Sequence, residues 1–386
     1  MTQTTWQKVE IKIFQAKNNI PLEWRLPSSY LEVLQDACQS VLGIPHRCGI
    51  LSEMEIHVTE AFDETALFEK PASRGLTAVE VTTAFCKRAA IAHQLTYCLT
   101  ETFFDTALRR ARELDDHLEA TGKTTGPLHG LPISVKECYN IAVGFKPSAS
   151  QVPYGNIGSA ARLEMARFLP CAGSLSHTVR DVELLLRVVL NSNAADLDDN
   201  ALGVPWNATR QRPSLRAGVL PEDALYRLAS SNAACSEKCS DQHFKADVIH
   251  LRGKDLAFRF FNMNPDRTAL SHVKNGDEPF IPSLKSTYDL DKNAPEPQLL
   301  ELYQLNVSKA KLLTRMRQVF VENKVDPVSY HSEGQMHLKT PNLSETFRTR
   351  RSEVEGAPCH IQLTGKPMRD EDLIQDALIV EKVLQG

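Results

Sequence analysis

The sequence predicts an α/β fold in which helices alternate with short apolar strands. Apolar residues recur at helical spacing in three long stretches, residues 77–92, 104–118 and 298–323. Apolar runs of strand length lie between and after them, at residues 131–135, 215–220 and 360–363. Repeats of fixed period and low-complexity tracts are missing from the sequence, so we expect one domain over residues 1–386.

The first long helix is expected to begin after Thr77. Thr77 and Glu80 have the spacing of a capping box, in which the hydroxyl and the carboxylate satisfy free amides of the first turn. The next helix is expected from residue 104, and Gly122 marks its end. Thr178 and Asp181 stand where a third helix should begin.

The remaining segments carry weaker signals. A last helix is expected around Leu373, Ala377, Val380 and Leu384. Residues 1–60 show turn signals in place of long periodic elements, and residues 228–250 and 262–297 are polar and predicted to be irregular.

Composition restricts the class of protein. Of 386 residues, 42% are hydrophobic and 24% charged, with a net charge of −4, so a sizeable core is expected and a general attraction to nucleic acid or an anionic membrane is not. The sequence shows neither the apolar run of a membrane span nor the apolar core of a signal peptide. Nine scattered cysteines are typical of reduced thiols. We expect a cytoplasmic protein.

Lys136 is the candidate catalytic residue. It stands at the end of the apolar run 131–135, and ligands of open α/β sheets tend to bind at the carboxyl ends of strands. Burial among such residues disfavours the charged ammonium, and a neutral lysine can act as a base. The alternative is a surface lysine paired with Glu137.

Other candidate sites have less support. Cys235, Cys239, His243 and His250 are zinc-ligand types, but their spacing fits no usual finger, and a solvated loop is the alternative. The sequence has neither a Gly-x-Ser-x-Gly elbow to partner a histidine nor a glycine-rich phosphate loop. Among the histidines considered for Ser-His-Asp catalysis (His93, His129 and His177), the first and last are expected to be structural or surface groups. We therefore expect no metal, nucleotide or other cofactor.

Residues 126–136, which read Gly-Pro-Leu-His-Gly-Leu-Pro-Ile-Ser-Val-Lys, resemble the amidase signature family in its fungal acetamidase-like branch. The resemblance extends over about two thirds of the chain, through residues 20–24, 48–52, 77–101, 144–148, 152–155, 176–190, 205–206, 215–223 and 356–365.

The resemblance implies a mixed sheet surrounded by helices and hydrolysis of a carboxylic amide by a Ser-cisSer-Lys triad. Lys136 takes the lysine position of that triad. In such a triad one serine attacks the carbonyl and a bridging serine passes the proton towards the lysine. The implied ligand is a small-molecule amide, and one implied role is a step in a small-molecule biosynthetic pathway. Family analogy also implies a homodimer.

Two segments depart from the family pattern. Residues 137–143 read Glu-Cys-Tyr-Asn-Ile-Ala-Val, without serine or glycine, where the family places both catalytic serines. The nearby hydroxyls match neither serine motif (Ser148, Ser150 and Ser159). A second departure follows Asp326. We therefore expect internal deletions after Asn140 and near Asp326, and an incomplete fold.

Three interpretations remain open at this point. In the first, the chain is an amide hydrolase. In the second, it is a non-catalytic remnant that acts as a binding protein. In the third, the sequence comes from a wrongly assembled gene, and the true protein contains the segments that are missing here.

Overall fold

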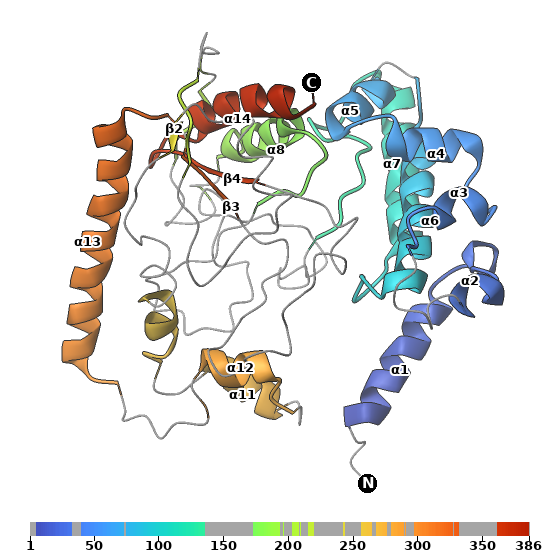
Figure 1. Cartoon of the computed structure of the whole chain (residues 1–386). Coiled ribbons are helices and arrows are strands. Elements are labelled where there is room, and N and C mark those ends of the chain that lie inside the picture. The colour runs from blue at the N-terminus through green and yellow to red at the C-terminus, as the bar shows by residue number, and fades with distance from the viewer. Residues whose placement is uncertain are drawn as a thin grey trace. The chain divides into compact units, whose positions relative to one another are not determined.

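The computed structural model of the chain divides into two compact units. The first contains Met1–Gly158 and Ala172–Gly203, and the second contains Ser159–Cys171 and Val204–Gly386. The structure describes residues 5–32, 40–72, 75–135, 173–193, 196, 203–207, 209, 215–219, 242–243, 256–264, 268–275, 279–288, 290, 297–326, 328–331 and 361–385. Figure 1 traces these elements along the chain.

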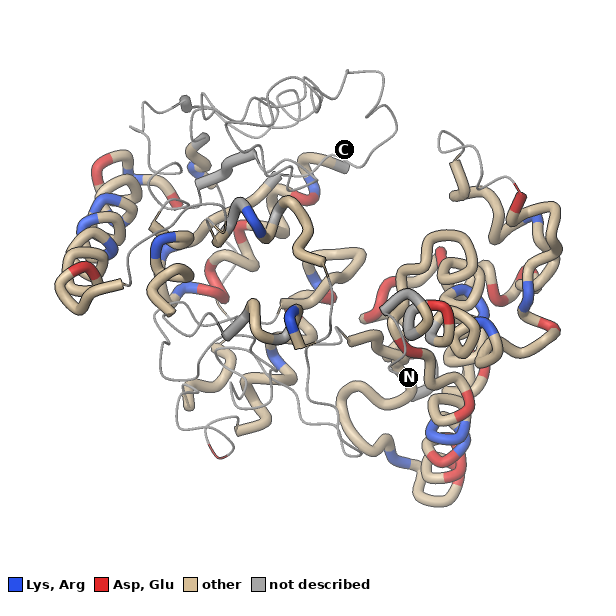
Figure 2. The backbone as a smooth tube through the Cα atoms, turned by 90° about the horizontal axis from the view of Figure 1, so that it is seen from below, with Lys and Arg blue, Asp and Glu red and all other residues tan. Residues whose placement is uncertain are grey.

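Helices make up the described part of the first unit. Their bounds are α1 Thr5–Asn18, η1 Leu22–Trp24, α2 Ser28–Glu32, α3 Ile44–Arg47, α4 Glu53–Glu60, α5 Glu64–Ala72, α6 Ala78–Thr96, α7 Phe104–Thr121 and α8 Val179–Leu190. Helices α6 and α7 pack side by side, and α4 packs on α6. Acidic and basic residues both occur on the described helices (Figure 2).

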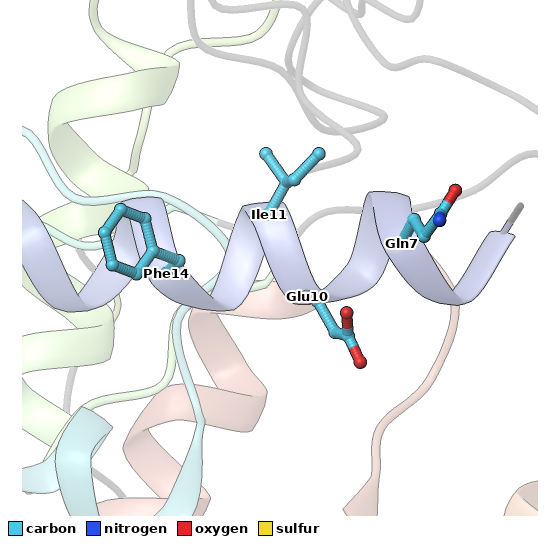
Figure 3. A pocket seen from close by; sticks show the side chains of 4 residues that line it. All are labelled: Gln7, Glu10, Ile11 and Phe14. Carbon is cyan, nitrogen blue, oxygen red and sulfur yellow. The ribbon is translucent and has the colours of Figure 1, made fainter. Parts of the chain in front are cut away.

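Helix α1 presents apolar side chains to solvent. Ile11 is 41% exposed and Phe14 65% exposed. Together with Gln7 and Glu10 they line an open pocket of about 550 Å³ along the helix (Figure 3). These side chains include no nucleophile, so we assign no catalysis to this pocket.

Helix α6 begins with the predicted capping box. The Glu80 amide donates to the Thr77 hydroxyl at 3.0 Å, and the Thr77 amide donates to the Glu80 carboxylate at 2.8 Å. Asp115 of α7 adds a second cap, because its carboxylate accepts from the amides of Ala78 at 2.7 Å and Val79 at 3.0 Å. Three otherwise free amides of the first turn are thus satisfied, and α7 is tied to the start of α6.

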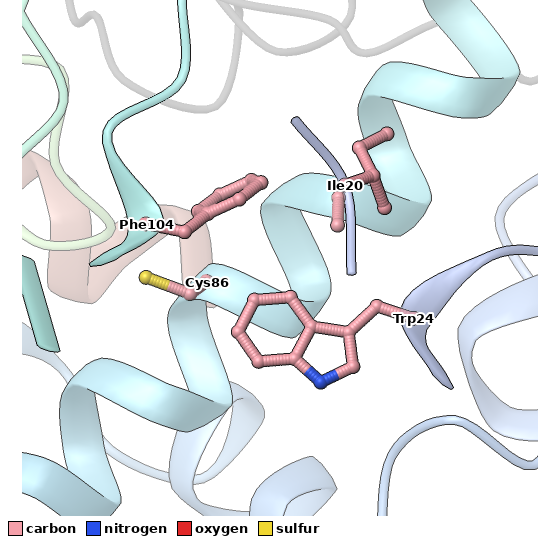
Figure 4. Packing of buried hydrophobic residues seen from close by; sticks show 5 residues of the cluster. Ile20, Trp24, Cys86 and Phe104 are labelled. Carbon is pink, nitrogen blue, oxygen red and sulfur yellow. The ribbon is translucent and has the colours of Figure 1, made fainter. Parts of the chain in front are cut away.

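The apolar side of α6 organises three buried clusters of the first unit. In one of them the Trp24 and Phe104 rings meet edge to face, with centroids 5.5 Å apart, beside Ile20, Cys86 and Ala90 (Figure 4). A second cluster, nearer the C-terminus of α6, contains Leu26, Ile44, Leu51, Ile91 and Leu95. A third, nearer its N-terminus, contains Val58, Leu67, Val81 and Ala84. Every one of these residues is less than a tenth exposed.

The second unit contains a mixed four-stranded sheet in the order β2-β1-β3-β4. The strands are β1 Gly218–Val219, β2 Gln242–His243, β3 Val328–His331 and β4 Ile361–Thr364. Strand β1 runs parallel to β2 and β3, whereas β3 and β4 are antiparallel, with Tyr330 opposite Gln362.

The described helices of the second unit are α11 Thr268–Asn275, α12 Pro282–Thr287, α13 Leu299–Asn323 and α14 Asp370–Gln385. Helix α14 contacts strand β4. Leu305 of α13 is fully buried against a short helical segment that supplies Leu256, Phe260 and Met263. Lys324 takes a left-handed conformation, φ 53°, and ends α13.

The predicted α/β class with a mixed sheet and surrounding helices is confirmed, as are α6, α7, α8, α13, α14 and the apolar strands β1 and β4. The prediction for residues 1–60 was wrong, because α1 is a helix of 14 residues. Residues 262–297 were also wrongly predicted to be irregular, since α11 and α12 lie there. The single-domain organisation and the internal deletions remain predictions.

Candidate functional site

Lys136, the predicted catalytic base, lies outside the described residues, directly after the described segment 126–135. Residues 131–135 were predicted to be a buried strand, and the structure corrects this. They have no regular secondary structure, and Ile133 and Val135 are 48% and 40% exposed. Ile133 and Val135 are therefore not the buried side chains that the sequence predicted.

His129 holds the turn that precedes this segment. Its side chain is 3% exposed, and its Nδ1 accepts from the Thr125 amide at 3.2 Å. Backbone bonds from His129 to Gly126 and from Leu131 to Leu128, both 3.2 Å, close the turn, and Gly130 has φ 79°. A positive φ of this kind favours glycine, which explains the His-Gly pair at this place.

The acceptor role of Nδ1 places the proton of His129 on Nε2. Burial lowers the pKa of His129, so the neutral ring is favoured. The buried Nε2 has no hydrogen-bond partner in the part of the chain that the structure describes. His129 is thus a positioning group for the turn before Lys136, and the Ser-His-Asp role considered for it has no support from these contacts.

The turn is attached to the helical core through Leu131. This half-buried side chain packs against the cluster of Val58, Leu67, Val81 and Ala84. These four residues come from α4, α5 and α6, so the segment that leads to Lys136 is attached to the helical core of the first unit.

The N-terminus of α5 also meets the N-terminus of α8, in an acid cluster of Asp63, Glu64, Thr65, Thr178, Arg180 and Asp181. Asp181 of α8 is fully buried, and its carboxylate accepts from the amide and the hydroxyl of Thr65, both at 2.7 Å. It also accepts from the Thr178 hydroxyl at 2.6 Å. The two bonds from Thr65 join residues 116 positions apart in the sequence.

Asp63 makes the return connection from α5 to α8. Its carboxylate accepts from the Arg180 guanidinium through two nitrogens, and it also accepts from the Ala66 amide at 2.9 Å as the cap of α5. Burial acts to raise the pKa of Asp63, but the Arg180 bond and the Ala66 amide together hold that pKa below its ordinary value.

The pKa values of Glu64 and Asp181 shift in opposite directions. Burial and the hydrogen bond to Asp181 raise the pKa of Glu64. Burial also acts to raise the pKa of Asp181, but bonds from Glu64, Thr178 and Thr65 outweigh it and bring that pKa well below the ordinary value. The bonds from Thr65 and Thr178 stabilise the ionised form of Asp181.

The other predicted histidines have structural or surface environments, as expected. His93 is buried; its Nδ1 accepts from the Leu99 amide at 3.2 Å, and burial lowers its pKa. His177 is 70% exposed and lies 3.6 Å from Glu64.

The zinc hypothesis gains no support. Cys235, Cys239 and His250 lie outside the described residues, and the backbone of His243 belongs to β2, opposite Val219. Within the described ranges, His, Cys, Asp and Glu form no group of three suited to a metal ion. Ser148, Ser150, Ser159 and residues 137–143 also lie outside the described residues.

The sequence reasoning missed the acid cluster. The signal for part of it was present, because Thr178 and Asp181 have the spacing of a helix cap and were used only to place the start of α8. The long-range pairing of Asp181 with Thr65 has no signal in a single sequence. None of the described helices is long and apolar enough to cross a membrane.

Comparison with known proteins points in one direction. The sequence model of the Amidase family matches residues 80–142 and 138–250. The chain is 43% identical to an amidase of Gibberella moniliformis over 143 residues, which are 36% of this chain and 27% of that protein. It is 38% identical to the acetamidase of Emericella nidulans over 185 residues, 48% of this chain and 32% of that protein. The chain spans about a third or less of the length of the curated relatives it matches.

A solved structure supports the same assignment at the level of the fold. The chain resembles a fatty acid amide hydrolase with a TM-score of 0.79 and 18% identity, over 98% of this chain and 95% of the other. The family match begins within α6 and includes Lys136, and the predicted mixed sheet with surrounding helices is the fold of that hydrolase. This chain is thus similar to the Amidase family over residues 80–250, and its fold is that of the fatty acid amide hydrolase.

Proposed function

We propose that the protein has the site of an amide hydrolase, with Lys136 as the base and a carboxylic amide of a small molecule as its ligand. The observation that carries this proposal is the match of residues 80–142 to the Amidase family, which contains Lys136 together with its glycine-flanked turn. In the proposed reaction a neutral lysine takes the proton of a nucleophilic hydroxyl through a bridging serine, and the hydroxyl attacks the amide carbonyl. The C–N bond then breaks while the lysine returns its proton to the leaving amine or ammonia, and water hydrolyses the remaining acyl-enzyme ester to release the acid.

The chain itself is proposed to turn over amides poorly or not at all. Residues 137–143 offer neither of the two serines that the triad needs, and members of a triad act as a unit, so that losing one removes most of the rate gain. The family match supports a gap at this place, because its two segments meet at residues 138–142, beside Asn140.

Two alternatives follow from this gap. In one, the chain is an inactive remnant that binds an amide or a partner protein. In the other, the gene contains coding sequence between Asn140 and Gly144 that this chain lacks, and the longer protein is the active amidase. Sequencing the transcript across Asn140 to Gly144 separates these two: an uninterrupted transcript identical to this chain would rule out the longer protein.

Activity is tested with the purified chain, acetamide as substrate and a serine-reactive phosphonate as label. We expect neither ammonia release nor labelling. Labelling at a single serine that disappears in Lys136→Ala, but persists in the control Lys123→Ala, would overturn the proposed inactivity. Lys123 suits this control because it is an exposed lysine outside the turn of residues 125–131.

Binding without turnover is tested by equilibrium dialysis with radiolabelled acetamide. Saturable binding by the wild-type chain that is weakened in Lys136→Ala and unchanged in Lys123→Ala would support an amide-binding remnant. Equal retention by all three proteins would contradict it.

A further inference from the structure

We propose that the outward side of α13 is a docking surface for an anionic lipid membrane, on which the helix lies flat. The surface consists of six apolar side chains and two cations of the uninterrupted helix Leu299–Asn323 (Figure 1). The proposal concerns binding and does not depend on amide hydrolysis.

Helix α13 is apolar on two sides. Its inward side carries Leu305, Val319 and Phe320, each at most 3% exposed. One such buried side is what a surface helix needs to pack on its core. Six further large apolar side chains on this helix are between 54% and 63% exposed: Leu299, Leu300, Tyr303, Val307, Leu313 and Val321.

The exposed apolar side chains form a strip along the helix. At about 100° per residue, Tyr303, Val307 and Val321 lie on the side opposite Leu305 and Val319. This second apolar side therefore faces away from the core of the second unit.

The strip is long. From Leu299 to Val321 the helix rises by about 33 Å at 1.5 Å per residue. A protein groove usually holds a helix by anchors within about two turns, whereas a membrane interface accepts a helix along its whole length. Tyr303 adds an aromatic ring with a polar tip, a side chain that is enriched at membrane interfaces. The length and composition of the strip favour a lipid surface over a groove.

The acidic residues of α13 are already paired. Glu301 lies 3.6 Å from the guanidinium of Arg259, and Glu322 lies 3.1 Å from that of Arg315. The sequence of α13 contains no other acidic residue. The remaining exposed charge of the helix is therefore positive.

Two exposed cations lie along the strip. Lys311 stands one turn after Val307, and Arg317 stands one turn after Leu313 and one turn before Val321. Their long stems can cover apolar neighbours while the charged groups reach outward. Near an anionic membrane surface each such cation strengthens binding by about fivefold. The strip thus combines apolar contact with a charge opposite to that of anionic headgroups.

A second copy of the chain fits this side less well. Two outward sides brought together would place the same excess of positive charge on both faces, and like charges across an interface cost free energy. Anionic phospholipids offer the opposite charge. Because the net charge of the chain is −4, the attraction is confined to this surface and is not a property of the whole molecule.

Sedimentation with vesicles tests the proposal on the full chain. One set of vesicles contains phosphatidylcholine alone, and the other contains about a quarter phosphatidylserine. We expect binding to the anionic vesicles to be at least about tenfold tighter, and to weaken as salt rises from about 0.05 to 0.5 M.

The double variant Lys311→Glu with Arg317→Glu tests the cations. We expect its binding to anionic vesicles to be at least about twentyfold weaker than that of the wild type. The matched control is Arg109→Glu with Arg112→Glu, which changes the net charge equally at exposed positions of α7. It should bind within about threefold of the wild type.

The variant Tyr303→Ser tests the apolar strip. It removes a ring that is 57% exposed, and we expect binding to anionic vesicles to weaken by about fivefold or more. Phe14→Ser removes a ring of α1 that is 65% exposed and should leave binding unchanged. All of these positions are exposed, and circular dichroism verifies that each variant is folded.

Three results would overturn the proposal. The first is equal binding, or no binding, to the two kinds of vesicle. The second is an equal loss of binding in a variant and its control. The third is a dimer, measured by sedimentation velocity, that Tyr303→Ser converts to a monomer while vesicle binding is unchanged. Binding is read without an amide, so failure of the proposed hydrolysis leaves these outcomes unaffected.

Discussion

Asp63 and Asp181 each accept hydrogen bonds from the helix on which the other resides. Asp63, at the start of α5, accepts from Arg180 of α8, and Asp181 of α8 accepts from Thr65 of α5. Each carboxylate lies at a helix N-terminus, where the free amides and the helix dipole favour negative charge. This exchange joins two helix starts that the sequence separates by more than a hundred residues.

Asp181→Ala is expected to be among the most destabilising substitutions in the first unit. It leaves the partly buried Thr65 amide and hydroxyl without the Asp181 acceptor, and we expect the free energy of unfolding to fall by about 3 kcal/mol. Urea unfolding followed by circular dichroism measures this. Asp116→Ala, at an exposed position of α7, is the control and should change stability by less than about 0.5 kcal/mol. Equal stability of the two variants would contradict the role of Asp181.

The two caps of α6 should differ in strength. Thr77→Ala removes one acceptor for the Glu80 amide, at an expected cost of about 1 kcal/mol. Asp115→Ala removes the acceptor of two amides and the tie between α7 and α6, so we expect a larger loss, about 2 kcal/mol. Thermal unfolding of both variants orders them, and a smaller loss in Asp115→Ala would show that the second cap is dispensable.

Trp24→Ala should open a cavity beside Phe104. Trp24 is 6% exposed and packs edge to face on Phe104, so we expect a loss of about 3–5 kcal/mol. Phe14→Ala on α1 deletes an aromatic ring that is 65% exposed and should cost far less, within about 0.5 kcal/mol. Denaturant titration of the pair tests the buried cluster, and a large effect of Phe14→Ala would indicate that a partner covers α1.

Acid should weaken the contact between α4 and α6 through Glu55. Burial acts to raise the pKa of Glu55, but bonds from Lys87 and Ser52 outweigh it and lower the pKa. A lowered folded-state pKa means that this contribution is present above the ordinary glutamate range and is lost as the pH falls through the lowered value. Glu55→Gln should therefore reduce stability at pH 7 and flatten its decline below about pH 4. If the free energy of unfolding of this variant falls below pH 4 as steeply as that of the wild type, the role of Glu55 is contradicted.

Local signals explain which elements could be predicted. Helix α6 carries its own cap and a regular apolar spacing, so the sequence of that segment alone determines its start. Strand β2 has two residues, too few to show an alternating pattern, and its pairing with β1 depends on a segment far away in the chain. Helix α1 was missed because Ile11, Ile13 and Phe14 are all exposed and give no single apolar face.

For the candidate site, the sequence predicted which residue to consider but not the surroundings of the segment that leads to it. The family resemblance identifies Lys136, and a single sequence contains the turn chemistry around Gly130, whose φ of 79° explains the glycine. The exposure of Ile133 and Val135 depends on what else packs there, which no local pattern encodes. Burial of Asp181 likewise results from the return of α8 to α5 and could not be read from the residues of α8 alone.

Cys86 provides the first unit with an internal reporter of unfolding. The thiol lies beside Trp24 and Phe104 and is 8% exposed, and burial raises its pKa to about 11 (Figure 4). Thiolate is the reactive form, so a neutral-pH thiol reagent should modify the exposed Cys98 at once and reach Cys86 only when the cluster opens. The rate of the slow reaction would then time the opening of this core, and it needs neither an added label nor a known substrate.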